Sequence, residues 1–253
     1  EKIWPKLLAH RSAITHVAFS IDGATQEEHD KWRGDGSFIR LVRAFSRCFA
    51  ADLPFIVKVV VRRDTLPQLE RLALFAARMG ASALHFAHVT PTSSDIENTS
   101  ALGLEERTQA EREIALLARI FKMKIGIDVG YYNINEAPPC SALAGISSNV
   151  DYRGRLSVCC NLSGYRSGIG EEDVAADLNT QDFASAHAML SKISADKLAA
   201  RALRLNDIAS NGLPVDLYTA SPCLFCLDTS GKLPWRHSTA VAAARVLPVL
   251  GAV

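Results

Sequence analysis

The amino-acid sequence predicts an α/β protein in which a parallel sheet with covering helices comes first and a smaller α+β domain follows. Strand-like and helix-like segments alternate through the first half of the chain, and the pattern changes near residues 131–139. Strands separated by helices of this length form parallel sheets with right-handed crossovers. We therefore expect two domains, residues 1–135 and residues 136–253.

The alternation can be followed element by element. Apolar or β-branched runs predict four strands, at residues 16–22, 54–63, 81–92 and 124–130. Apolar residues at helical spacing predict three helices, at residues 37–51, 65–80 and 103–122. The second helix has Thr65 as a possible N-cap, Pro67 in its first turn and Gly80 as a C-cap. The first half is therefore a piece of a βα barrel or of a doubly wound sheet.

The second half has a different pattern. Residues 149–160 predict a hairpin that turns at Arg153 and Gly154, and residues 182–209 predict one or two Ala-rich helices. The apolar stretch at residues 238–253 is too short to span a membrane and is interpreted as a helix or a packed tail.

Composition and charge exclude several classes of protein. The 253 residues carry 28 Lys and Arg against 27 Asp and Glu, so no basic surface indicates nucleic-acid binding. The chain begins at Glu1 without a signal peptide, and we expect it to be a fragment that starts within a domain of a longer protein. Its six cysteines and the missing secretory signal favour the reducing cytoplasm, where clustered cysteines bind metal more often than they form disulfides.

A C-x-x-C at Cys223 and Cys226 forms half of a candidate metal site. Its most economical partners are Cys140 and Cys159, in the pattern C-x13-G-x4-C-C. Four thiolates suit either tetrahedral zinc or an iron–sulfur cluster, and spacing does not separate the two. Adjacent strand residues point to opposite faces, so we assign Cys159 as the ligand, and an exchange of roles with Cys160 stays open. The alternative is that all are ordinary buried cysteines, as we expect for Cys48 on its helix.

Two parts of the sequence resemble a known family. The segment "VAFSIDGATQEEHDKWRGDGSF" (residues 17–38) resembles the fourth-strand region of radical S-adenosylmethionine (SAM) enzymes, in which S-[IL]-D-G, His-Asp, Arg-Gly and Gly-Ser-Phe recur in that order. The cysteine pattern resembles the SPASM/twitch extension that follows such barrels. The resemblance implies the C-terminal part of a partial (β/α)6 radical SAM barrel, followed by a small SPASM/twitch-like domain.

The resemblance also implies SAM contacts at the C-terminal ends of the strands, where such folds build their sites. Ser20 would face the SAM ribose or carboxylate, and Asp22 would shape the turn or the substrate pocket, although Asp22-Gly23 also suits a plain turn. The expected cofactor-binding residues are Ser20, Asp22, Arg33, Arg62, Val89 and Thr90.

The arginines of this set could pair with the SAM carboxylate, as could Arg63, or they could lie at solvated strand ends. Val89 and Thr90 could offer backbone groups to adenine. His88 is expected to be packed or solvent-facing rather than catalytic.

For the extension, the resemblance implies one auxiliary [4Fe–4S] cluster with four ligands: Cys140, Cys159, Cys223 and Cys226. No cysteine follows Cys226, which makes the arrangement twitch-like. The chain contains no C-x3-C-x2-C for the radical-generating cluster and no second-strand glycine motif for SAM. Both are expected on preceding residues, and these 253 residues alone should not generate the radical.

The expected reaction is hydrogen-atom abstraction by a 5′-deoxyadenosyl radical, with the auxiliary cluster oxidising or binding the substrate. A peptide substrate is favoured over a small molecule, with flavodoxin or ferredoxin as electron donor and no nucleic-acid or membrane partner. Sulfatase-maturing relatives carry an Asp base where this chain has Cys160, which argues against their reaction. The alternatives are a non-enzymatic zinc-binding module and a degenerate peptide-binding family member.

Overall fold

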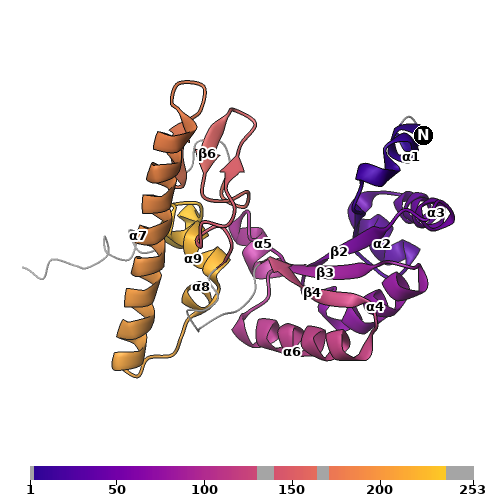
Figure 1. Ribbon diagram of the computed structural model, residues 1–253. Helices are drawn as coiled ribbons and strands as arrows, with labels where there is room; N and C mark the ends of the chain where they lie inside the picture. Colours follow the sequence, from indigo (N-terminus) through magenta and orange to yellow (C-terminus); the bar gives the residue numbers. More distant parts are fainter. Residues whose placement is uncertain (1–2, 130–139, 164–170, 238–253) are drawn as a thin grey trace, which may run out of the picture. The chain divides into compact units, whose positions relative to one another are not determined.

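The computed structural model describes residues 3–129, 140–163 and 171–237, which form two compact units (Figure 1). The first, here called the sheet unit, contains the chain up to Val89 and continues from Thr99 to the last strand of its sheet. The second, here called the C-terminal unit, contains residues 90–98 and the rest of the described chain.

The sheet unit is built on four parallel strands in the order β1-β2-β3-β4. Their bounds are β1 Val17–Ile21, β2 Phe55–Val61, β3 Ala83–His88 and β4 Lys124–Val129. All four lie within the predicted strand segments. The α/β class with a parallel sheet is confirmed.

Helices connect these strands, as the sequence predicts. The main ones are α3 (Ser37–Ala50), α4 (Leu69–Arg78, preceded by the 3-10 turn η2, Leu66–Gln68) and α6 (Leu104–Ile120). Before β1 the chain forms α1 (Trp4–Ala9) and the 3-10 turn η1 (Arg11–Ala13). Helices α1, α3, α4 and α6 and the turn η2 contribute to one apolar core together with alternate residues of the strands.

The alternation along β2 and β3 shows which sheet face the helices cover. Val57, Val59 and Val61 of β2 are almost completely buried and pack in one cluster with Leu84 and Phe86 of β3. The residues between them are more exposed. One face of the sheet therefore packs against helices, and the opposite face, here called the inner face, carries the other half of each strand.

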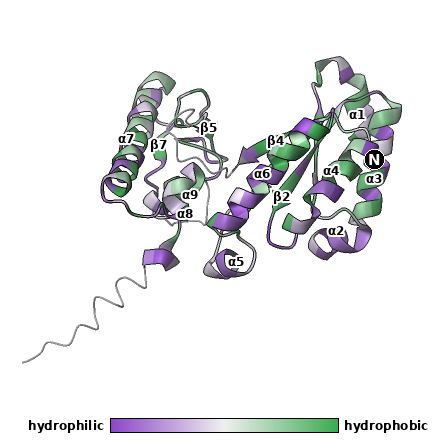
Figure 2. Cartoon of the chain, turned by 90° about the horizontal axis from the view of Figure 1, so that it is seen from below, coloured by the Kyte–Doolittle hydropathy of each residue, from purple (hydrophilic) through white to green (hydrophobic). Residues whose placement is uncertain are grey.

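Helix α2 (Gln26–Arg33) was not predicted, because its sequence "QEEHDKWR" has no apolar stripe. Figure 2 shows it as a hydrophilic element. A capping box sets its start: the Thr25 hydroxyl accepts from the Glu28 N–H, and the Glu28 carboxylate accepts from the Thr25 N–H. The helix ends at Gly34, which adopts a positive φ of 83°.

The C-terminal unit contains a small antiparallel sheet in the order β5-β6-β7. Its strands are β5 (Asn149–Val150), β6 (Arg155–Ser157) and β7 (Val174–Asp177), and the first two form the predicted hairpin. Gly154 in the turn has a φ of 81°, and a Cβ there would lie 2.7 Å from the Asn179 amide nitrogen. The turn therefore requires glycine for both backbone and space.

Helices complete the C-terminal unit. The Ala-rich segment forms a single 28-residue helix, α7 (Phe183–Ser210), where the sequence left one or two open. Two short helices follow, α8 (Leu217–Ala220) and α9 (Pro222–Thr229), and α9 carries the C-x-x-C. In the part of the chain that the structure describes, no helix combines the length and apolarity that crossing a membrane requires.

Residues 90–98 join the C-terminal unit through a polar contact. Glu97 lies on α5 (Ser94–Thr99), and its carboxylate accepts hydrogen bonds from the Tyr218 hydroxyl and from the Trp235 indole N–H. The guanidinium carbon of Arg236 lies 3.1 Å from the centre of the Tyr218 ring. Residues directly after β3 are thereby fixed to the region around α8 and α9.

Candidate functional site

The inner face of the sheet carries polar residues in its middle. Ser20, Lys58, His85 and Gly126 lie in one register row across β1, β2, β3 and β4. Parallel sheets are normally apolar on both faces because helices cover both. A lysine and a histidine in the middle of this row indicate a polar interior instead. A Cβ at Gly126 would meet no atom within 4 Å, so the row ends in open space.

An ion pair that begins at Lys58 of this row crosses the inner face. The Lys58 Nζ lies 2.6 Å from an Asp128 carboxylate oxygen, although β3 separates their strands. Asp128 sits where the register between β3 and β4 shifts: Phe86 pairs with Ile127, whereas Ala87 pairs with Val129. Such irregularities are common beside active sites, where they redirect a side chain. The sequence analysis missed Lys58, His85 and Asp128, since their convergence depends on sheet register.

Asp22 lies at the end of β1 as predicted, and it is the centre of a charged network. Its carboxylate accepts from Arg62 Nη1 at 2.8 Å and from Arg33 Nε at 2.5 Å. Asp22 and Arg62 are both buried, with side chains 5% and 7% exposed. Burial alone would raise the pKa of Asp22, but the hydrogen bonds and charges of the two arginines hold it below its ordinary value.

Arg62 is further engaged on its other sides. Its Nε donates to Asp64 at 3.0 Å, and its guanidinium carbon lies 4.1 Å from the centre of the Trp32 ring. The Trp32 indole N–H donates to the second Asp64 oxygen at 2.9 Å. Three of the predicted SAM-contacting residues thus bind one another, and Arg62 is not at a solvated strand end. Their assignment to SAM stays a prediction.

The His-Asp and Gly-Ser-Phe parts of the family-like segment have local roles in this fold. The His29 Nδ1 accepts a hydrogen bond of 3.1 Å from the Asp22 N–H. The Asp30 carboxylate accepts from the Gly36 N–H, the Ser37 hydroxyl and the Phe38 N–H at 2.7–2.8 Å, which caps the start of α3. Despite an opposing desolvation effect, these bonds lower the pKa of Asp30 to about 2.

The remaining sheet-unit candidates lie at the end of β3. The Val89 N–H donates to the Val61 carbonyl at 3.1 Å, and its carbonyl accepts from Arg107 at 3.5 Å. Thr90 directly follows and is partly buried. His88 is buried beside Glu111 of α6, with 3.3 Å between Nε2 and the carboxylate, so it is packed on the helix-covered face.

The four predicted metal-binding cysteines come from separate segments of the C-terminal unit. Cys140 begins a turn, Cys159 lies two residues after β6, and Cys223 and Cys226 lie on α9. Cys226 belongs to the core of the unit, and Cys140 and Cys159 pack against this core. The Ser221 side chain caps α9. The fold therefore brings together residues up to 86 positions apart, from Cys140 to Cys226.

The thiols influence one another electrostatically. The pKa of Cys226 is raised to about 12: burial is the largest cause, Lys197 opposes it, and the neighbouring thiols of Cys140, Cys223 and Cys159 add to it. Burial raises the pKa of Cys159 to about 11, against backbone hydrogen bonds that lower it. Buried thiols are neutral at pH 7, and a bound metal replaces their protons.

As placed, no three Cys, His, Asp or Glu side chains in the described ranges 3–129, 140–163 and 171–237 converge closely enough to hold a metal ion. Binding a metal would therefore require the thiols to close in. By donor chemistry the set fits zinc or an iron–sulfur cluster. Cys160 is exposed, and Cys48 is buried in the core of the sheet unit.

The fold and these sequence features relate the chain to radical SAM enzymes. A solved structure titled anSMEcpe with bound AdoMet and a Kp18Cys peptide matches with a TM-score of 0.51 at 14% identity, covering 74% of this chain and 53% of that chain. Another structure of anSMEcpe with bound AdoMet matches with a TM-score of 0.53 at 13% identity and the same coverage. These likenesses establish the fold: a partial barrel followed by a small domain.

Particular curated proteins are also similar in sequence. The mycofactocin maturase MftC of Mycolicibacterium smegmatis is 38% identical over 161 residues, which cover 62% of this chain and 40% of that protein. The AdoMet-dependent heme synthase of Methanosarcina barkeri is 31% identical over 88 residues, covering 34% of this chain and 25% of that protein. No family model matches the chain. The chain thus spans less than half the length of these curated relatives, and the resemblance inferred from the sequence is confirmed.

Proposed function

We propose that this chain is the C-terminal portion of a radical SAM enzyme that removes a hydrogen atom from a peptide and holds one auxiliary [4Fe–4S] cluster. The observation that carries the proposal is that Cys140, Cys159 and Cys226 share the apolar core of the C-terminal unit and that Cys223 lies on the same helix as Cys226. The sheet unit of the same chain has the fold of AdoMet-binding enzymes. The peptide is favoured because MftC is named a maturase and one anSMEcpe structure contains a peptide.

The chain's own residues would divide the work between the units. SAM with its cluster would supply the radical chemistry, and the auxiliary cluster would supply a one-electron acceptor or a substrate ligand. The inner-face residues Lys58, His85 and Asp128 would orient the substrate by charge and hydrogen bonds. The network of Asp22 and Arg62 would fix the strand ends around which SAM binds. The predicted contacts of Ser20, Arg33, Val89 and Thr90 to SAM remain part of this proposal.

Two features support the choice of ligands. Cys159 faces the core of the C-terminal unit while Cys160 is exposed, which favours Cys159. The two α9 cysteines are three positions apart and share one helix face. The chain contains no C-x3-C-x2-C, so generation of the radical is not assigned to these residues.

The test is anaerobic reconstitution of the 253-residue chain with ferrous iron and sulfide, followed by metal, sulfide and optical analysis. The proposal predicts about four iron and four sulfide ions per chain, with the broad absorption near 400 nm typical of such clusters. A colourless protein with one bound zinc ion and no iron would contradict it and would favour the structural zinc module. Hydrogen abstraction is then tested on a protein that also carries the radical-generating part. The measurement is the transfer of deuterium from a labelled peptide to the 5′-deoxyadenosine formed from SAM.

A further inference from the structure

Lys197 of α7 is an unusual residue in the C-terminal unit, because its side chain is buried. It is 8% exposed, and its Nζ donates a hydrogen bond of 2.7 Å to the Ser230 hydroxyl. Lysine is seldom buried unless an anion compensates its charge. Lys232, also buried in this unit, has such a partner: its Nζ lies 2.9 Å from the Asp173 carboxylate.

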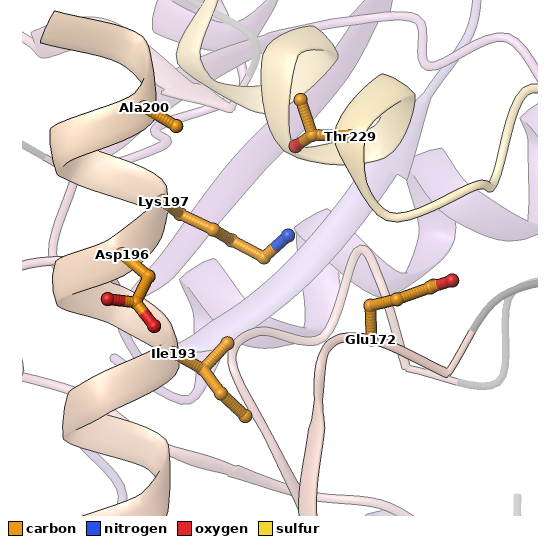
Figure 3. Close-up of a pocket in the computed structure, with 6 residues that line it drawn as sticks. All are labelled: Glu172, Ile193, Asp196, Lys197, Ala200 and Thr229. Carbon is orange, nitrogen blue, oxygen red and sulfur yellow. The ribbon is translucent and has the colours of Figure 1, made fainter. Parts of the chain in front are cut away.

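Lys197 has no comparable carboxylate among the described residues. Figure 3 shows it extending from α7 along a pocket of about 300 Å³ toward the helix that carries Thr229. Asp196 and Glu172 line the same pocket, yet neither forms an ion pair with Lys197. Lys197 donates instead to the Ser230 hydroxyl, and a neutral hydroxyl does not balance the charge of a buried ammonium.

The negative charge that would balance this ammonium is the candidate cluster. Ser230, which holds Lys197, lies one turn after Cys226 and donates its backbone N–H to the Cys226 carbonyl at 3.0 Å. Cys226 is itself 6% exposed. The hydrogen bond from Lys197 to Ser230 and the backbone hydrogen bond from Ser230 to Cys226 thus link the buried ammonium to the residue that carries this thiol.

Helix α7 places a second cation one turn further along. Arg201 is 7% exposed and donates to the carbonyl oxygens of Thr219 at 3.1 Å and Ala220 at 3.3 Å, just before the C-x-x-C helix. Packing explains the Ala-rich amphipathic pattern of α7. It does not explain why two buried cations of this helix bind the segments on either side of the C-x-x-C.

We propose that Lys197 is a positioning residue for the auxiliary cluster, and that its positive charge beside Cys226 makes the cluster easier to reduce. This inference rests on the proposed function, since it requires the cluster. Reduction adds one electron, supplied by the substrate radical in the reaction or by dithionite in an experiment. The added negative charge is stabilised by a nearby buried cation, which raises the reduction potential.

The test is an EPR-monitored redox titration of the reconstituted chain with dithionite. Lys197→Met should retain the iron content but move the midpoint potential to a more negative value, because the side-chain stem stays and the charge is lost. Lys197→Arg keeps the charge and should restore a potential close to that of the wild type. Lys192→Met is the matched control: Lys192 is exposed on the same helix, and its removal should leave the potential unchanged.

The outcomes are separable. An unchanged potential in Lys197→Met with full iron content overturns the inference and leaves the proposed cluster intact. A wild-type chain that binds no iron overturns the proposed function and the inference with it. Should Lys197→Met fail to fold, Lys197→Gln, which stays polar and neutral, carries the same comparison with Lys197→Arg.

Discussion

Replacing Asp22 by Asn tests whether the charged network organises the end of the sheet. The substitution preserves the size of the side chain but leaves Arg62, 7% exposed, beside a neutral amide. Removing one partner of a buried ion pair costs about 3–5 kcal/mol. Arg62 keeps its 3.0 Å bond to Asp64, and Arg33 is half-exposed, so we expect the lower end of that range, about 3 kcal/mol.

The assay is urea denaturation followed by tryptophan fluorescence, because Trp32 stacks on Arg62 and senses the network directly. Asp52→Asn is the control: Asp52 is 93% exposed and pairs with Arg11, so the same chemical change there should cost less than about 1 kcal/mol. A loss of stability in Asp22→Asn no larger than that in Asp52→Asn would show that the buried ion pairs do not stabilise this end of the sheet.

Comparing Asp22→Asn with the wild type as the pH is lowered gives a second test. The pKa of Asp22 is lowered in the folded protein, so the folded state binds fewer protons than the unfolded state when the pH falls below about 4. The stabilisation by Asp22 is complete above that pH and is lost as the pH falls through the folded pKa. Asp22→Asn should therefore show a smaller loss of stability on acidification than the wild type, whereas an identical acid profile would contradict the pairing.

Other predictions concern packing and charge in the sheet unit. Gly23→Ala should lower the free energy of unfolding by at least about 1–3 kcal/mol, because a Cβ there would lie 2.2 Å from a side-chain carbon of α2. Gly126→Ala, which meets no atom within 4 Å, should change it by less than about 0.5 kcal/mol. Equal urea midpoints for the two variants would contradict this. Lys58→Met should cost less than about 1 kcal/mol in urea, as expected for a partly exposed ion pair, yet reduce turnover of the peptide in the longer enzyme; unchanged kcat/KM would argue against a substrate role. Burial lowers the pKa of His88 against the raising effect of Glu111, so NMR titration should find a neutral imidazole at pH 7, with a stability contribution lost as the pH falls below about 6.5; protonation above that pH would contradict the packing.

The sheet was predictable from the sequence because its strands and long helices carry strong local patterns. β2 has β-branched residues in an almost unbroken run, and α6 has buried residues at helical spacing. Helix α2 was missed because its capping box, formed by Thr25 and Glu28, sets the helix without an apolar stripe. A capping box can therefore indicate a helix in a sequence that has no hydrophobic periodicity.

The candidate sites were predictable only in part. The four cysteines were grouped from their spacing and from the family-like order of the motifs, and this ligand set stays a prediction. The partners of Asp22 could not, because Arg62 lies 40 positions away and is reached only through the pairing of β1 with β2. The ion pair of Lys58 and Asp128 depends on an irregular register between β3 and β4, which leaves no mark in the sequence pattern.

Whether these four cysteines hold an iron–sulfur cluster can be measured by the iron content of single variants. Each of Cys140→Ala, Cys159→Ala, Cys223→Ala and Cys226→Ala is reconstituted beside two controls, Cys48→Ala in the sheet unit and Cys160→Ala on the surface. We predict that each ligand variant loses most of the roughly four iron ions per chain and that both controls retain them. Full iron content in Cys226→Ala, or its loss in Cys160→Ala together with its retention in Cys159→Ala, would contradict this ligand set.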